Sequence, residues 1–289
     1  NLASAMTAPG DLILVPNPTY PIHAYGFMIA GGTLRHIPSL VEGVFNAEKY
    51  LNTLSRAVMH SIPKPIALVI SFPSNPTAQL CDLDFYKELV KFAKKHSIWI
   101  LSDLAYSEIY FDDNPPPSIL QIEGAKEVCV EFTSMSKTFS MAGWRVGFAV
   151  GNKYLINALT RIKSYLDYGA FTPVQVAAVE ALNGPQVYID QIRNEYKRRR
   201  DTLIASMNRA GWEIPKPPAT MFAWAPIPRK FQNMGSMEFA KMLMQKASVA
   251  VAPGIGFGEY GEGYVRIGLV ENEHRIRQAA KSIKKLIID

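Results

Sequence analysis

The sequence predicts an α/β protein with a mostly parallel sheet flanked by helices, followed by a smaller C-terminal α+β domain. Two observations predict this fold class: short apolar runs alternate with longer amphipathic stretches through the first half of the chain, and one long helical stretch ends that alternation. The runs expected as strands are 11–15, 33–37, 67–71, 98–102, 128–133 and 146–150, and the helical stretches include 82–96 and 153–166. Because parallel strands need crossover connections, we expect helices on both faces of one sheet.

The long helical stretch, 187–209, lies between the helix breakers Gly184-Pro185 and Gly211. After it, strands are expected at 221–225, 249–252 and 264–269, and helices at 236–247 and 271–288. We therefore predict a large α/β domain over 1–184, a linking helix over 185–210 and a small α+β domain over 211–289.

The length and composition are those of an ordinary globular protein with a large core. The 289 residues are 48% hydrophobic, which is enough for a substantial core, and no apolar run is long enough to span a bilayer. Two cysteines, Cys81 and Cys129, give no disulfide framework and favour a reducing, cytoplasmic setting. The histidines show no ligand spacing, so no metal is expected. The net charge of +6 includes the cluster 197–200, which is typical of a solvated helix face, and we expect no nucleic-acid or membrane partner.

Polar residues follow three of the expected strands. Asn75 comes after 67–71, Asp103 and Tyr106 come after 98–102, and Lys137 and Arg145 come after 128–133. Because the carboxyl ends of parallel strands meet at one edge, where ligands bind in open α/β sheets, we expect these side chains to converge.

The chemistry of this set indicates one kind of cofactor. A neutral lysine amine attacks a carbonyl, and the planar guanidinium of Arg145 suits a phosphate, which Ser134 and Ser136 would also hold. Asp103 would pair with a protonated pyridine nitrogen and so make the ring an electron acceptor. Taken singly, each residue has a simpler interpretation, because a lysine at a strand end is usually on the surface and an aspartate there usually caps a helix.

Three strings carry a resemblance to a known family: SFPSNPT at 71–77, SDLAYSEIYF at 102–111 and SMSKTFSMAGWRVGF at 134–148. They resemble the pyridoxal-phosphate-dependent aminotransferases of fold type I, class I/II, in the aspartate aminotransferase superfamily. The resemblance covers essentially the whole chain. It implies pyridoxal 5'-phosphate as cofactor, amino acid and 2-oxo acid substrates, transamination through a Schiff base on Lys137, and a homodimer.

The resemblance also implies roles for individual residues. Lys137 matches the Schiff-base lysine and Asp103 the partner of the pyridine nitrogen, while Asn75 and Tyr106 match contacts to the ring's phenolate oxygen. Tyr20, in the string NPTYP, matches a ring that stacks on the cofactor. Arg266, in the string GYVRIG, matches the arginine that binds the substrate α-carboxylate, and Asn75 is also expected to contact the substrate.

Two departures from the family pattern stand out. The chain begins at Asn1 without an initiator Met, where the family has a preceding arm and phosphate loop, so we expect an N-terminally truncated piece of the enzyme with uncertain activity of its own. Ala78 stands where the family commonly has glycine, which questions the geometry of that turn because alanine resists positive φ.

Substrate choice depends on the stretch 161–173. Dicarboxylate-specific relatives carry a second arginine there, but the matching positions here, Leu166 and Asp167, are not cationic. The stretch is most similar to the bacterial alanine (glutamate-pyruvate) aminotransferases, so we expect an alanine/glutamate specificity. Two alternatives stay open: a lyase or synthase on the same scaffold, and a non-catalytic domain that senses amines through bound cofactor.

Overall fold

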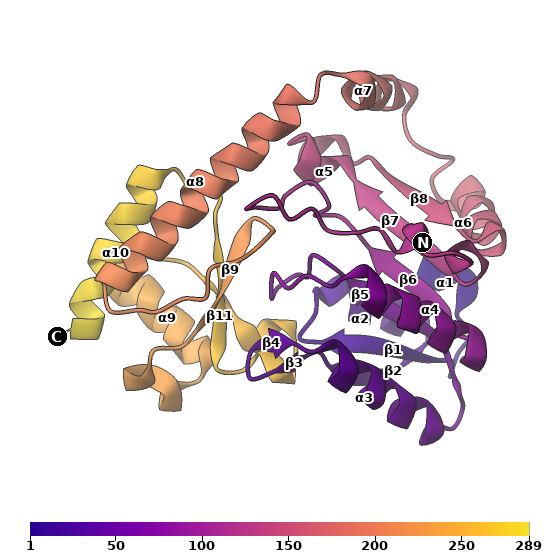
Figure 1. Ribbon diagram of the computed structural model, residues 1–289, viewed down its shortest axis with the longest axis horizontal. Coiled ribbons are helices and arrows are strands. Elements are labelled where there is room, and N and C mark those ends of the chain that lie inside the picture. Colours follow the sequence, from indigo (N-terminus) through magenta and orange to yellow (C-terminus); the bar gives the residue numbers. More distant parts are fainter. Residues whose placement is uncertain (289) are drawn as a thin grey trace.

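A six-stranded sheet forms the centre of the first part of the chain (Figure 1). A computed structural model describes residues 1–288. The sheet has the order β2-β1-β5-β6-β7-β8 and its strands are parallel except for β8, which runs antiparallel to β7. Its strands are β1 (Leu12–Asn17), β2 (Thr33–Pro38), β5 (Pro65–Ser71), β6 (Trp99–Asp103), β7 (Cys129–Ser134) and β8 (Gly147–Gly151). The predicted α/β class with a mostly parallel sheet is confirmed.

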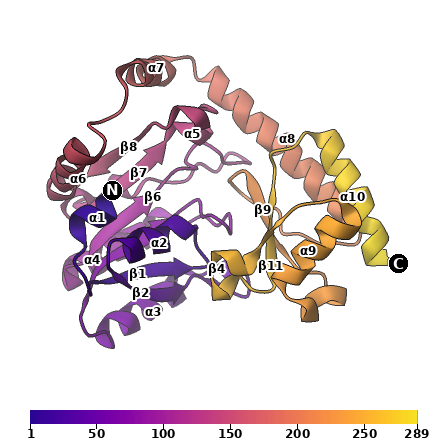
Figure 2. The ribbon, with the colours of Figure 1, turned by 180° about the vertical axis from the view of Figure 1, so that it is seen from behind.

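Helices cover both faces of this sheet, as Figures 1 and 2 show from opposite sides. Alternate residues of β1 lie on opposite faces of the sheet. Leu14 packs in a core with α3 and α4, whereas Ile13 and Val15 pack in a core with α1, α2 and α6. These helices are α1 (Leu2–Met6), α2 (Pro21–Ile29), α3 (Ala47–Met59), α4 (Leu83–His96) and α6 (Lys153–Leu166).

Side-chain caps define where three of these helices begin. Asn46, Asp82 and Asn152 each precede a helix, and each side chain accepts a hydrogen bond from a backbone N–H of the first turn. The expected helices at 82–96 and 153–166 are thus observed, the first of them starting one residue later because Asp82 is its cap.

A second, antiparallel sheet has the strand order β10-β11-β9. It packs against two helices, α9 and α10, and against part of the long helix α8. Its strands are β9 (Phe222–Pro226), β10 (Ala252–Pro253) and β11 (Tyr264–Gly268), and the helices are α8 (Val187–Arg209), α9 (Ser236–Ala247) and α10 (Glu273–Ile288). The remaining helices and strands are β3 (Leu40–Val41), β4 (Val44–Phe45), α5 (Met135–Thr138) and α7 (Thr172–Asn183), and there are six short 3-10 turns, η1 to η6.

Two expected boundaries in this region were wrong. The strand expected at 249–252 begins only at Ala252, because Ser248 has a left-handed φ of 55° and the Val249 N–H still donates to the Leu243 carbonyl at the end of α9. The helix expected from 271 begins at Glu273, because Asn272 accepts hydrogen bonds from the first turn. The long helix at 187–209 is confirmed at both ends.

The two cores on the faces of the large sheet contain residues from the range 2–159. The core of the small sheet contains residues from the range 196–287. The helix α8 packs in the core of the small sheet and lies beside α10 in Figure 1. It also contacts the segment after β6. There, Arg193 donates to Glu108 at 2.9 Å and its guanidinium lies 4.0 Å from the Tyr110 ring centroid. The division into domains at residues 184 and 210 stays a prediction.

Arg200 of α8 is fully buried and makes the most extensive of these contacts. Its guanidinium donates to Asp112 at 2.8 and 3.1 Å, to Asp201 at 2.9 Å and to the Pro217 carbonyl at 3.3 Å, and it lies 4.5 Å from the Phe111 ring centroid. Hydrogen bonding to Arg200 lowers the pKa of Asp112 from 3.8 to about 2. The buried guanidinium therefore joins α8 to the segment that follows β6.

We expect Arg200→Met to lower the free energy of unfolding by about 2 kcal/mol, which is less than a wholly buried ion pair costs because Asp112 is half-exposed. Urea unfolding measures this change. Since the pKa of Asp112 is depressed in the folded state, its contribution is complete well above pH 3.8 and is lost as the pH falls through about 2. Arg198→Met, on the exposed face of the same helix, is the matched control, and equal losses in both variants would contradict the prediction.

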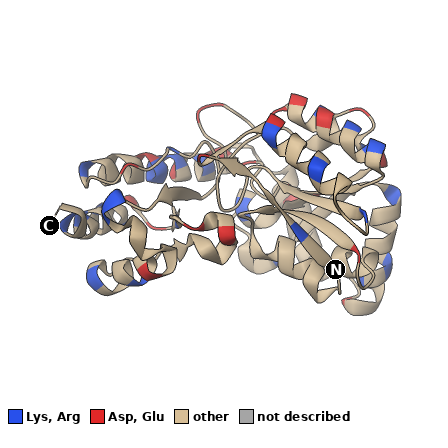
Figure 3. Cartoon of the chain, turned by 90° about the horizontal axis from the view of Figure 1, so that it is seen from below, with Lys and Arg blue, Asp and Glu red and all other residues tan. Residues whose placement is uncertain are grey.

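Basic and acidic positions are interspersed along the outer helices in the view of Figure 3. Within residues 1–288 there is no helix with the length and apolar character needed to cross a membrane. The same residues contain no group of three or more His, Cys, Asp and Glu side chains that are placed to hold a metal ion.

Candidate active site

One cavity of about 660 Å³ lies between the carboxyl edge of the large sheet and the small sheet. The segments that line it come from both sheets and from the loops after β1, β5, β6 and β7. All of the residues predicted from the sequence line this one cavity, namely Tyr20, Asn75, Asp103, Tyr106, Ser134, Ser136, Lys137, Arg145 and Arg266. The expected convergence at the strand ends is therefore observed.

Asp103 is the last residue of β6, and both of its carboxylate oxygens accept hydrogen bonds. His23 Nε2 lies 2.8 Å from Oδ2, and the Ala105 N–H donates to Oδ1 at 3.0 Å. Partial burial works to raise the pKa of Asp103, but the hydrogen bond and charge of His23, the Ala105 N–H and the charge of Lys137 together hold that pKa below its ordinary value. The geometry favours a carboxylate that stays ionised.

His23 and Thr19 belong to the site, although the sequence analysis did not identify them. His23 is buried in α2, and its Nδ1 lies 2.9 Å from the Thr19 hydroxyl, so a chain of contacts runs from Thr19 through His23 to Asp103. The available signal was the spacing of four residues between Thr19 and His23 across the start of a helix, next to Tyr20. The Tyr20 ring, which is 43% exposed, meets the His23 ring edge-on at 5.8 Å.

Lys137 is held by a short helix directly after β7. Ser134 caps this helix, because its side chain accepts a hydrogen bond from the Ser136 N–H at 3.1 Å. Lys137 Nζ lies 6.0 Å from the centroid of the Tyr106 ring. Burial is the larger cause, and the nearby charge of Asp103 the smaller one, that raises the pKa of Tyr106 well above its ordinary range. This phenol therefore stays protonated and can donate a hydrogen bond.

Arg145 borders the opening of the cavity and is exposed. Its backbone has a left-handed φ of 55°, and its guanidinium donates to the Ala142 carbonyl at 2.9 Å. Within residues 1–288 it forms no ion pair, so its charge is available to an anion in the cavity that Ser134 and Ser136 also line.

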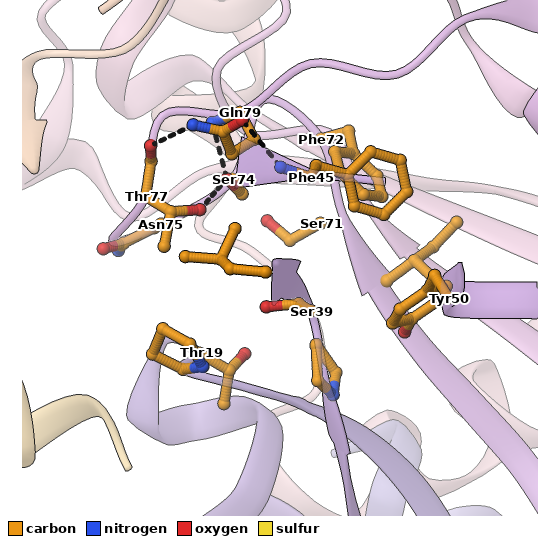
Figure 4. Close-up of a pocket in the computed structure, with 14 residues that line it drawn as sticks. Thr19, Ser39, Phe45, Tyr50, Ser71, Phe72, Ser74, Asn75, Thr77 and Gln79 are labelled. Carbon is orange, nitrogen blue, oxygen red and sulfur yellow. Dashed lines mark hydrogen bonds between the residues drawn. The ribbon is translucent and has the colours of Figure 1, made fainter. Parts of the chain in front are cut away.

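Asn75 is carried by a cross-linked turn after β5 (Figure 4). The Ser74 hydroxyl contacts that of Thr77 and accepts from the Gln79 N–H, and Gln79 in turn accepts from the Phe45 N–H. The turn closes with Ala78 at a φ of 56°. The glycine-like conformation is therefore kept despite the alanine, at a cost of about 1 kcal/mol.

Arg266 and Asn75 are in contact although they are 191 positions apart in the sequence. Arg266 lies on β11, and its NH1 donates to Asn75 Oδ1 at 2.7 Å. Partial burial lowers the pKa of Arg266, which nevertheless remains cationic because a guanidinium titrates far above neutrality. The cavity thus has a cation from the small sheet facing Lys137, Asp103 and Tyr106 from the large sheet.

Comparison with known proteins agrees with this geometry. The family model for aminotransferase class I and II matches residues 1–283. The chain belongs to the class I and II aminotransferases. AatC of Rhizobium meliloti strain 1021 is 65% identical to this aminotransferase over 287 residues, which are 99% of this chain and 70% of AatC.

Two further comparisons place the chain within the family. Glutamate-pyruvate aminotransferase AlaC of Escherichia coli K12 is 52% identical over 277 residues, which cover 96% of this chain and 66% of AlaC. The substrate-bound structure of BacF from Bacillus subtilis superposes with a TM-score of 0.90 at 36% identity and covers 99% of this chain and 71% of BacF. This aminotransferase chain thus spans roughly two thirds to 70% of the length of these proteins, and the predicted fold type I is confirmed.

The residues of the cavity fit pyridoxal 5'-phosphate, the cofactor of this family. The lining includes the Asp103 carboxylate, which accepts from His23, the Ser134 and Ser136 hydroxyls with the guanidinium of Arg145, which forms no ion pair within residues 1–288, and the amine of Lys137. These are the groups that a protonated ring nitrogen, a phosphate and a carbonyl carbon each require.

Proposed function

We propose that this aminotransferase exchanges the amino group of an L-amino acid with a 2-oxo acid in the cavity that contains Lys137. The observation that carries the proposal is the convergence of nine side chains, from segments spread over residues 20–266, on one cavity. Each of them has a chemical task in transamination.

The tasks follow from the positions of the side chains. Asp103, kept ionised by His23, would hold a proton on the ring nitrogen of the cofactor. Tyr106 and Asn75 would donate to its phenolate oxygen. Tyr20 would stack on the ring. The phosphate would be held by three residues near the start of α5, Ser134, Ser136 and Arg145.

When bound, pyridoxal phosphate supplies an electron-accepting ring that stabilises the negative charge left at the substrate Cα when its proton is removed. Lys137 Nζ would attach the cofactor covalently at rest and, once displaced by substrate, would accept the Cα proton as general base. Its neighbours Tyr106 and Asp103 would orient it toward that carbon. The small sheet would close the cavity over these groups and exclude water.

Arg266 would bind the α-carboxylate of the substrate, with Asn75 fixing one edge of its guanidinium. The lining beyond Arg266 includes Met221, Val251 and Val270, which suit a short apolar side chain. Similarity to AlaC supports the same choice, and we propose alanine as donor with 2-oxoglutarate as acceptor.

We also propose that the enzyme acts as a homodimer in the cytoplasm. The support is the apolar surface of α7 and the turn before it, where Phe171, Val176 and Val179 are each more than half exposed. The free cysteines Cys81 and Cys129 fit a reducing compartment.

An assay of product formation tests the proposal. The protein, expressed from its complete reading frame and supplied with pyridoxal phosphate, is given alanine, glutamate, diaminopimelate or an aromatic amino acid with each of several 2-oxo acids. We expect fastest exchange between alanine and 2-oxoglutarate. Ammonia release without an amino product would favour a lyase, and cofactor binding without any turnover would favour a sensor domain.

We expect Arg266→Gln to lower kcat/KM for every amino acid by about a hundredfold, because it removes the charged partner of the α-carboxylate. Steady-state kinetics measure this, and Arg275→Gln on the exposed side of α10 is the control. An unchanged kcat/KM would overturn the assignment of the carboxylate site.

A further inference from the structure

The guanidinium of Arg266 lies against two aromatic rings. Its Cζ is 4.9 Å from the centroid of the Phe222 ring and 4.6 Å from that of the Phe257 ring, and both rings are buried. The Asn75 amide oxygen accepts its hydrogen bond at 2.7 Å. Within the chain up to residue 288, Arg266 forms no ion pair.

This environment holds a cation without neutralising it. A carboxylate partner would fix the guanidinium but would compete with the carboxylate of a substrate, whereas an aromatic face and an amide oxygen attract the cation and leave its charge uncompensated. Two rings also restrict the guanidinium plane, so that its donors point along a defined direction. The neutral partners of Arg266 therefore suit a site that must receive an anion.

The two rings come from different parts of the small sheet region. Phe222 lies on β9, directly opposite Gly268 of β11, so no side chain separates its ring from Arg266 two positions earlier. The Phe222 ring also meets the Tyr106 ring edge-on at 5.4 Å. Phe222 thereby connects Arg266 to the side of the cavity that contains Lys137.

Phe257 ends the short turn η5 (Gly254–Phe257) and is anchored to the large sheet. Its carbonyl accepts a hydrogen bond from the Thr19 N–H at 2.9 Å, and Thr19 is the residue whose hydroxyl contacts His23. Next to it, Gly258 has a φ of 121°, and a Cβ there would overlap the Asn17 side chain. The close approach fixes Phe257 relative to the loop after β1.

We propose that Phe222 and Phe257 are positioning residues that form an aromatic clamp, which aims the guanidinium of Arg266 at the substrate α-carboxylate. This rests on the proposed role of Arg266. Because Phe257 is bonded to Thr19, the clamp also sets the position of the carboxylate-binding group relative to the Thr19, His23 and Asp103 chain.

The first test is kinetic. We expect Phe257→Leu to raise KM for both the amino acid and the 2-oxo acid about tenfold while kcat changes less than about twofold, since a desolvated cation–π contact is lost and the chemical groups remain. Phe222→Leu should act in the same direction, and Phe257→Tyr, which keeps the ring face, should restore KM. Phe231→Leu is the matched control, because this ring packs against Phe239 and does not touch Arg266.

The second test does not depend on turnover. In ¹⁵N NMR spectra of the protein without cofactor, the Arg266 Nε–H proton should resonate upfield under the ring currents of the clamp. It should move toward the ordinary arginine position in Phe257→Leu and Phe222→Leu but not in Phe231→Leu. Titration with propionate should shift the resonance in the wild type at lower concentration than in either clamp variant.

The two hypotheses fail in different ways. An unshifted Arg266 resonance, or an active wild type whose Phe257→Leu variant keeps its KM, would overturn the clamp and leave transamination standing. A wild type that exchanges no amino group would overturn the proposed function, and the clamp would then lack its role in catalysis even if the NMR signature were present.

Discussion

Lys137→Ala should abolish transamination, with a loss of at least about ten-thousand-fold in kcat. Lys137 lines the cavity together with Asp103, Tyr106 and the residues proposed to bind the phosphate, and within residues 1–288 no other lysine lines it. On the proposed mechanism, the substitution would remove both the covalent attachment of the cofactor and the base that moves the Cα proton.

Two measurements check this result. Turnover of alanine with 2-oxoglutarate reports the rate, and borohydride reduction followed by peptide mass mapping reports attachment of the cofactor, which should be found on the Lys137 peptide of the wild type only. Lys153→Ala, a surface lysine at the start of α6, is the control and should behave as wild type. If turnover persisted in Lys137→Ala, the assignment of the catalytic lysine would be wrong.

Asp103→Ala should lower kcat by about a thousandfold while part of the cofactor binding remains, because the residues proposed to hold the phosphate are untouched. The pKa of Asp103 lies below its ordinary value, so its carboxylate is charged in the native protein at neutral pH. Without that charge, a proton on the ring nitrogen is no longer stabilised, and the ring becomes a poorer electron acceptor.

The control for this prediction is Asp84→Ala, an exposed aspartate in the first turn of α4. Cofactor affinity is measured by fluorescence titration, and the rate by single-turnover kinetics. Asp103→Glu should recover part of the rate, since it restores the charge without the short contact to His23. Equal rates in Asp103→Ala and the wild type would exclude a role for this carboxylate at the ring nitrogen.

Much of the site was predictable from local sequence. Apolar runs that end in polar residues locate the ends of β5, β6 and β7, and parallel strands bring such ends to one edge. Asn75, Asp103 and Lys137 were found in this way, and the resemblance to aminotransferases added Tyr20 and Arg266. The helix over 187–209 was equally clear, because breakers stand near both of its ends.

Other parts of the site depend on packing between distant segments, which local patterns do not record. The pairing of His23 with Asp103 joins positions 80 residues apart, and the contact of Arg266 with Asn75 joins positions 191 residues apart. A buried histidine in an apolar helix and a phenylalanine in a turn have ordinary structural interpretations until their neighbours are known.

The sequence therefore predicted the fold class and the chemical groups of the cavity, because strand periodicity and strand-end motifs are local properties of the chain, and the resemblance of three strings indicated the family. The tertiary structure alone revealed the chain of contacts from Thr19 to Asp103 and the two aromatic rings against Arg266. The physical reason is that the pKa and the interactions of an ionisable side chain depend on its burial and on the groups beside it. In this protein, those neighbouring groups come from both sheets and from the loops that follow their strands.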